Sequence, residues 1–127
     1  MKIYLAARYS RLPEMQTYRD QLEGAGHKVT SRWVNGDHQV KDTTMSPAEA
    51  CRFAQEDWED LLVADMVISF TEPSRSGHSR GGRHVEHGIA LALRKRVVVV
   101  GHRENVFHCL PEVAFYPTWG LVVPDIA

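Results

Sequence analysis

The residues best able to do chemistry lie between Phe70 and Leu93, where an apolar segment leads into a basic, glycine-containing loop and then a helical pattern. Backbone N–H groups in such a loop, and the positive end of the helix dipole, both stabilise a bound anion. The candidate anion-binding residues of this stretch are Ser76, Gly77, Ser79, Arg80, Gly82 and Arg83. Glu86 lies one turn into the helix. We therefore predict a loop that holds a phosphate, beside a carboxylate that does covalent chemistry.

This loop differs from the better-known phosphate and cofactor motifs. A Walker loop requires Gly-Lys-Ser or Gly-Lys-Thr, whereas the sequence here is Gly81-Gly82-Arg83-His84. A dinucleotide fingerprint would follow the first strand, but the segment 6–9 lacks its glycines. No nicotinamide group, and no other cofactor, is expected.

Metal and serine chemistry are also disfavoured. His84, Glu86 and His87 form the closest group of metal-ligand types, but the two histidines lack the i, i+4 spacing of a His-Glu-x-x-His site. No Gly-x-Ser-x-Gly pattern marks a nucleophilic serine. Glu86 remains as the candidate nucleophile. A carboxylate suits displacement at an anomeric carbon, where it stabilises and then traps an oxocarbenium-like sugar, and a second, protonated carboxylate would assist the leaving group.

Asp57 is the candidate for that second carboxylate. Ser46, Pro47 and Glu49 form a helix start with a capping box, and the helix should run to about residue 63. The inward stripe of this helix is predicted to contain Ala50, Ala54, Asp57 and Leu61, while Glu56, Glu59 and Asp60 face elsewhere. An alternative is that Asp57 only bonds a backbone group or an arginine in the core.

These residues must be positioned by alternating strands and helices. Apolar and β-branched runs predict strands at 2–7, 27–33, 66–70, 97–100 and 113–115, and helical spacing predicts helices at 13–25, 46–63 and 82–93. In the third of these helices Glu86, Ile89, Ala90 and Leu93 should share the inward stripe. The alternation predicts an α/β fold, a doubly wound (Rossmann-like or flavodoxin-like) parallel sheet of about five strands flanked by helices.

Such sheets bind ligands outside the carboxyl ends of their strands. The rule brings together Arg8 after the first strand, the basic loop after the third and the segment 102–108 after the fourth. We therefore expect one site at this edge, with Arg8 contributing to anion binding.

The bulk composition is that of one soluble domain spanning residues 1–127. The formal net charge is −1, so a nucleic-acid polymer is not the expected partner. No apolar run approaches the roughly 18 residues of a membrane span, and no secretory signal is visible. Cys51 and Cys109 have no CxxC spacing. We expect a cytoplasmic protein without a membrane partner.

Three motifs resemble the nucleoside 2-deoxyribosyltransferase-like superfamily, which includes nucleoside deoxyribosyltransferases and nucleoside 5′-monophosphate N-glycosidases. They are the opening strand 3–7, the segment running from 55–58 through 64–68, and the helix 82–90. Together the motifs cover most of the chain, from Ile3 to about Pro111. The resemblance implies a small nucleoside or nucleotide substrate, with N-glycosidic bond cleavage as the reaction.

The resemblance also implies roles for individual residues. Glu86 matches the family's nucleophile, Tyr4 matches the tyrosine that orients it, and Asp57 matches the residue that handles the base proton. Family members complete the site with a residue from a neighbouring subunit, which corresponds to about His108 here, so a homodimer or larger homo-oligomer is implied.

The resemblance leaves the acceptor open. The runs 46–50 and 84–86 look more like the cytidine monophosphate hydrolase branch, in which water accepts the sugar, whereas the deoxyribosyltransferases pass the sugar to another base. This chain has several additional residues between Pro73 and Glu86, so Ser74, Ser76 and Ser79 all remain candidates for a phosphate contact.

Two other functions remain open from the sequence. One is a nucleotide-binding sensor or regulatory module that breaks no bond. The other is a riboside-phosphate hydrolase of the cytokinin-activating type, although its Pro-Gly-Gly-x-Gly-Thr motif is missing here.

Overall fold

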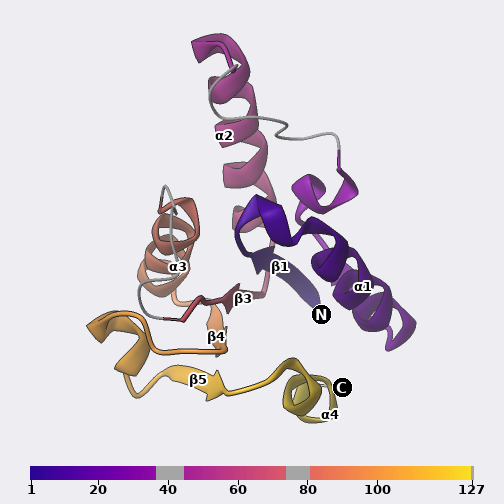
Figure 1. Cartoon of the computed structure of the whole chain (residues 1–127), viewed down its shortest axis with the longest axis vertical. Coiled ribbons are helices and arrows are strands. Elements are labelled where there is room, and N and C mark those ends of the chain that lie inside the picture. Colours follow the sequence, from indigo (N-terminus) through magenta and orange to yellow (C-terminus); the bar gives the residue numbers. More distant parts are fainter. Residues whose placement is uncertain (37–44, 74–80, 127) are drawn as a thin grey trace.

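A computed structural model describes residues 1–36, 45–73 and 81–126 of the chain (Figure 1). Five parallel strands form a single sheet in the order β2-β1-β3-β4-β5. The strands are β1 (Lys2–Ala6), β2 (Lys28–Val29), β3 (Met66–Phe70), β4 (Arg96–Val100) and β5 (Val113–Tyr116). The predicted doubly wound parallel sheet of about five strands is therefore confirmed.

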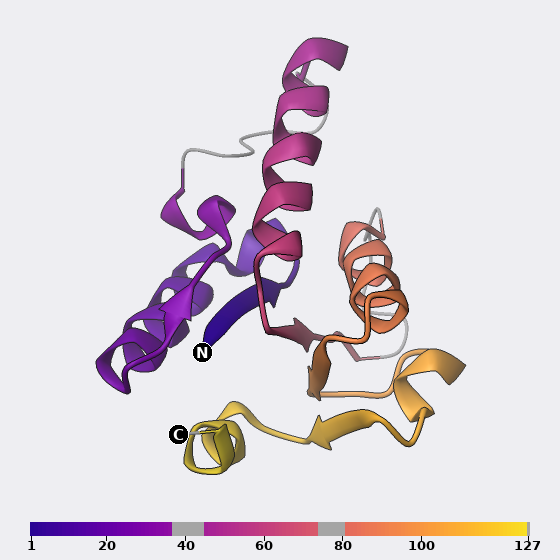
Figure 2. The same cartoon turned by 180° about the vertical axis from the view of Figure 1, so that it is seen from behind.

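Helices cover both faces of the sheet. The α-helices are α1 (Leu12–Gly24), α2 (Pro47–Leu62), α3 (Gly82–Ala92) and α4 (Val122–Ile126), and the 3-10 helices are η1 (Tyr9–Arg11), η2 (Arg32–Asn35), η3 (Val106–Cys109) and η4 (Trp119–Leu121). Figures 1 and 2 show α1 and α4 on one side of the sheet and α3 on the other. The segment η4–α4 was not predicted, because the short apolar pieces after residue 116 have no clear period.

Along the described residues, no helix has the length and apolar character needed to cross a membrane.

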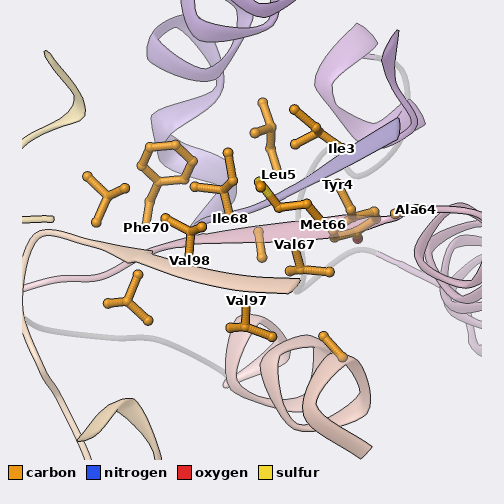
Figure 3. Close-up of a cluster of buried hydrophobic side chains, with 14 of the residues drawn as sticks. Ile3, Tyr4, Leu5, Ala64, Met66, Val67, Ile68, Phe70, Val97 and Val98 are labelled. Carbon is orange, nitrogen blue, oxygen red and sulfur yellow. The ribbon is translucent and has the colours of Figure 1, made fainter. Parts of the chain in front are cut away.

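The core is built on β3, in which all five residues are buried. In Figure 3 its side chains alternate, with Met66, Ile68 and Phe70 on one face and Val67 on the face that carries α3. Such continuous burial is typical of a central parallel strand. Ile3 and Leu5 of β1 join the first face, so Tyr4 between them belongs to the face with α3 (Figure 3).

The second strand is much shorter than predicted. The sequence favours a strand over residues 27–33, but β2 ends at Val29 and the chain turns into η2. Side chains then replace the strand ladder, because Ser31 Oγ accepts from Leu5 N–H at 3.1 Å and Trp33 Nε1 donates to Leu5 O at 2.8 Å. Thr30, Ser31 and Trp33 are therefore buried although the strand has already ended.

The helix α2 reaches past the sheet. Ser46 caps it as predicted, accepting from Glu49 N–H at 3.1 Å. Residues 46–52 are all exposed (Figure 1), so the prediction that Ala50 and Ala54 face inward is wrong, and Ala54 is exposed as well. A helix of 16 residues is longer than strands of five, so its amino end extends beyond the sheet and is exposed among the described residues.

Asp60 was predicted to face away from the core but is 6% exposed. Its carboxylate accepts from the backbone N–H and the Nε of Arg32, each at 2.9 Å. This pairing joins α2 to η2 and explains why an acid can be buried here.

The predicted inward stripe of α3 is confirmed at Ala90, and Ile89 packs against the core, but Leu93 does not belong to it. The buried residues of α3 are Arg83, His87 and Ala90, while Leu93 is 48% exposed. Glu86 is half-buried at the border of this stripe. The helix thus buries the polar side chains of Arg83 and His87 at positions where apolar residues would be expected. Buried polar groups of this kind need partners inside the fold.

The carboxyl ends of β3 and β4 are held close together. Thr71 N–H donates to Val100 O at 3.0 Å, and Thr71 Oγ1 accepts from His102 N–H at 2.5 Å. Gly101 has φ +117°, and a Cβ there would lie 2.9 Å from Thr71 Oγ1. Glycine is needed at this position both for the backbone conformation and for the close approach. The two chain segments that follow these strands therefore begin side by side.

Candidate functional site

The hydroxyl of Tyr4 donates a hydrogen bond to Oε2 of Glu86. Tyr4 lies in β1 with none of its surface exposed, and Glu86 is half-buried in α3. The parallel pairing of β1 with β3 brings the first strand beneath the helix that follows β3. Two residues 82 positions apart in the chain thus meet on the α3 face of the sheet.

The surroundings favour the neutral form of Glu86. Burial raises the pKa of Glu86 to about 8, the hydrogen bond from Tyr4 opposes this, and the negative charge of Asp57 adds to it. Burial and the charge of Glu86 also raise the pKa of Tyr4 well above its usual value, so Tyr4 remains a donor. The arrangement can therefore offer a protonated carboxyl or, once ionised, a carboxylate that is supported by one hydrogen bond.

Asp57 belongs to the same site. It is half-buried on α2, and its charge raises the pKa values of both Tyr4 and Glu86. The structure thus brings together the three residues that the sequence singles out for chemistry. Of the two acids, Glu86 is the one shifted toward its neutral form, so it must first lose its proton before it can act as a nucleophile.

The arginines near the site have carboxylate partners. Arg11 Nη1 lies 2.9 Å from Glu72 Oε2, and Arg8 Nη1 lies 3.6 Å from Glu72 Oε1. Arg83 is 6% exposed and binds Glu104 through both Nη atoms, with 2.9 Å between Nη2 and Oε2. Arg8 and Arg83 were predicted to hold the substrate anion. Arg8 is half-buried at the carboxyl edge, whereas the guanidinium of Arg83 is occupied inside the fold.

The start of α3 is exposed at its first residue. Gly81 takes the left-handed conformation, with φ +85°, and Gly82 is the first helical residue and is exposed. Ser76, Gly77, Ser79 and Arg80 were predicted to bind phosphate and lie outside the described residues.

His108 is enclosed within its own chain. It is 1% exposed, and its Nδ1 accepts from Glu104 N–H at 2.9 Å. Burial lowers the pKa of His108 to about 4, helped by the nearby positive charges of His87 and His84. A neutral, enclosed ring does not fit a role across a subunit boundary.

Among the described residues, no group of three or more His, Cys, Asp or Glu side chains is arranged to hold a metal ion.

Sequence reasoning missed Glu72 and Glu104, the two carboxylates that hold the arginines. A usable signal was present, because both residues follow the carboxyl ends of neighbouring parallel strands, β3 and β4. The same rule drew attention to 102–108 for its histidines. A cluster of arginines predicts acids in the fold as readily as it predicts a bound anion.

The sequence pattern of the nucleoside 2-deoxyribosyltransferase family matches residues 3–125. No curated protein sequence matches the chain. Among solved structures, the fold is similar to a 2-deoxyribosyltransferase from Bacillus psychrosaccharolyticus, with a TM-score of 0.75 and 22% identity over 96% of this chain and 90% of that one.

Two further solved structures are similar. The CMP N-glycosidase BcmB of Clostridium botulinum has a TM-score of 0.57 and 20% identity, over 91% of this chain and 87% of that one. A conserved protein from Enterococcus faecalis V583 has a TM-score of 0.52 and 18% identity, over 82% of this chain and 65% of that one. At these identities the comparison establishes a shared fold.

The pKa of Glu86 predicts a pH-dependent effect of Glu86→Gln on stability. The folded-state value of about 8 lies above the ordinary value of 4.5, so ionising Glu86 costs folding free energy as pH rises through this window. We expect Glu86→Gln to leave stability nearly unchanged at pH 4 and to raise it at pH 9, by up to roughly 5 kcal/mol, since each unit of the shift from 4.5 to about 8 is worth about 1.4 kcal/mol.

Urea unfolding of both proteins at the two pH values measures this difference. Glu112→Gln, at an exposed acid, is the matched control and should show no pH-dependent gain. A Glu86→Gln protein less stable than the parent at pH 9 would contradict the assignment.

Proposed function

Because this chain belongs to the nucleoside 2-deoxyribosyltransferase family, we propose that it cleaves the N-glycosidic bond of a nucleoside or nucleoside 5′-monophosphate, with Glu86 as the nucleophile. The observation that carries the proposal is the hydrogen bond from the buried Tyr4 to the carboxyl group of Glu86. It holds one oxygen of Glu86 and leaves the other available to attack.

The first step forms a covalent bond to the sugar. An oxygen of ionised Glu86 attacks the anomeric carbon, the bond to the base breaks, and the bonding electrons leave with the base nitrogen. Asp57 in its protonated form donates a proton to the departing base. Negative charge near the sugar stabilises the oxocarbenium-like transition state, and Tyr4 keeps the attacking group oriented.

The second step releases the sugar. A water molecule attacks the anomeric carbon, the Glu86–carbon bond breaks with its electrons returning to Glu86, and Asp57 takes the proton of the water. Both carboxyl groups are then in their starting states. If another base takes the place of water, the same steps transfer the sugar between bases.

A 5′-phosphate on the substrate is proposed from the basic loop of residues 74–83 and the open amino end of α3. Exposed Gly82 at that helix end offers a backbone N–H group for such an anion. Arg83 does not contribute a free cation to this contact, since Glu104 occupies its guanidinium.

The proposal predicts base release that depends on Glu86. Incubation with each common nucleoside and nucleoside monophosphate, with and without an added free base, should release the original base as followed by chromatography. Glu86→Ala should reduce the rate by about a thousandfold or more because the nucleophile is gone, and substrate binding by calorimetry should remain.

The same assay separates the proposal from a non-catalytic nucleotide sensor. A sensor would bind nucleotide without forming product and would tolerate Asp57→Asn. The enzyme should lose about a hundredfold in rate with Asp57→Asn because the base would leave without a proton. Binding with no base released from any substrate would reject the enzymatic proposal.

The pKa of Glu86 predicts how activity depends on pH. Only ionised Glu86 attacks, so kcat/KM should rise with pH through a value near 8. Tyr4→Phe removes a hydrogen bond that favours the ionised form, so this limb should move to higher pH and the rate at pH 7 should fall about tenfold or more. A pH profile that is flat between 6 and 9 in the parent, or unmoved in Tyr4→Phe, would contradict the assigned roles.

We further propose that the protein forms a homodimer through the side that carries the site. Large apolar side chains are exposed there on α2, α3 and η3. They are Trp58, Leu62, Val85, Leu93, Val106 and Phe107. Apolar surface of this kind is usually covered by a partner, and the family resemblance favours a second copy of the chain.

Light scattering after size exclusion should therefore give about twice the chain mass of 14.4 kDa. Phe107→Asp, at a side chain 61% exposed on η3, should shift the protein toward the monomer because a charge would be buried at the contact. Leu121→Asp, at a similarly exposed side chain on η4, is the control and should leave the mass unchanged. A monomeric parent protein would reject this proposal.

A further inference from the structure

Two residues that flank Glu86 on α3 are buried against one short segment, 104–108. Arg83, one turn before Glu86, binds the carboxylate of Glu104 through both of its Nη atoms. His87, the residue after Glu86, packs edge-on against His108 with 4.7 Å between the ring centroids. These residues are 6% and 3% exposed. The part of α3 that carries Glu86 is thus held by this segment at two points.

Glu104 is the residue that joins these contacts. Its Oε1 accepts from Glu72 N–H at 3.0 Å, and its own N–H donates to His108 Nδ1 at 2.9 Å. Burial opposes the ionisation of Glu104, but the hydrogen bonds from Arg83 and Glu72 outweigh it and lower the pKa of Glu104. Glu104 is therefore an ionised group with several fixed donors.

The contacts continue to the strand that carries Tyr4. Glu72 is the second residue after β3, and its carboxylate pairs with Arg11 at 2.9 Å and lies 3.6 Å from Arg8. Both arginines lie just after β1. Ion pairs therefore join Glu72 to the segment after β1 and Glu104 to the first turn of α3, and the hydrogen bond from Glu72 N–H to Glu104 connects the two.

The apolar contact of α3 with the core comes from Ala90, which is fully buried, and from Ile89 and Leu91, which are partly buried. The turn that carries Glu86 has no buried apolar side chain of its own among these, since Val85 is 62% exposed. The hydrogen bond between Tyr4 and Glu86 weakens steeply with misalignment. A displacement of about 1 Å in a reacting group can reduce a rate by about a hundredfold.

We propose that Glu104 is a positioning residue that sets α3 relative to β1, and so holds Glu86 in its hydrogen bond with Tyr4. The inference rests on the proposed role of Glu86 in the reaction. A buried ion pair adds little net stability compared with apolar residues of similar size, which fits a role in geometry rather than in holding the fold together.

The first test is kinetic and uses Glu104→Gln, which keeps the shape of the side chain and removes its charge. We expect kcat to fall about 10- to 100-fold with KM within about threefold. In a Tyr4→Phe background the same change should cost less than about threefold, because the hydrogen bond on which Glu104 acts is already gone. Additive effects in the double variant, or an unchanged kcat in Glu104→Gln, would overturn the proposal. Glu112→Gln, at an exposed acid between η3 and β5, is the control and should leave kcat unchanged.

The second test does not depend on catalysis or on the folding of Glu104→Gln. Replacing both partners, Arg83→Met with Glu104→Leu, removes the two charges together and should preserve the fold. NMR of carboxyl-labelled glutamate then reports the titration of Glu86. We expect its pKa to move upward from about 8, as in Tyr4→Phe, because the hydrogen bond that favours ionisation is loosened. An unchanged titration would overturn the proposal.

The two ways of failing can be told apart. If Glu86→Ala still releases base at the parent rate, the proposed function is wrong. If Glu86→Ala is inactive and the Glu104 variants behave as the parent, the function stands and only the positioning role falls.

Discussion

The hydrogen bond between Tyr4 and Glu86 is the interaction on which the rest of the structure depends. A carboxyl group and a phenol buried together cannot be left without partners, since an unpaired buried polar group costs free energy. Each therefore needs the other, and the sheet must place them correctly. β1 supplies Tyr4 from a fully enclosed position, and α3 presents Glu86 at the border of its buried face.

The second constraint is the balance of charge at the carboxyl edge of the sheet. Glu72 and Glu104 follow β3 and β4 and take up the positive charges of Arg8, Arg11 and Arg83. Each carboxylate also touches a neighbouring segment, so charge neutralisation and chain placement are achieved by the same contacts. In this fold class ligands bind at the carboxyl edge of the sheet. Here internal ion pairs fix the chain segments that form this edge.

Sequence reasoning recovered the fold because strands and helices alternate with strong periodicity. The unbroken apolar run 97–100, and the largely apolar run 66–70, are typical of buried parallel strands. Sequence reasoning failed where side-chain hydrogen bonds outweigh the strand or helix propensity of a segment. Ser31 and Trp33 end β2 early by bonding the backbone of Leu5, and Asp60 is buried because Arg32 reaches it. Neither contact leaves a periodic signal, since both join residues far apart in the chain.

The site was predicted in part for the same reason. Tyr4, Asp57 and Glu86 could be named from motifs and helical spacing, and the structure brings them together. The partners of the arginines could not be named, because pairing depends on which strand ends become neighbours. The burial of Arg83 and His87 on α3 was also missed, because it depends on the carboxylate of Glu104 and the ring of His108, which come from a distant segment.

The central claim is that Glu86 becomes bonded to the sugar. The most direct measurement is intact-protein and peptide mass spectrometry after incubation with a nucleoside whose sugar carries fluorine at the 2′ position, which slows release by destabilising the oxocarbenium-like transition state. We expect a mass increase equal to the fluorinated sugar, located on the peptide that contains Glu86 and absent from Glu86→Gln. Label on a different residue, or base release by Glu86→Gln at the parent rate, would contradict it.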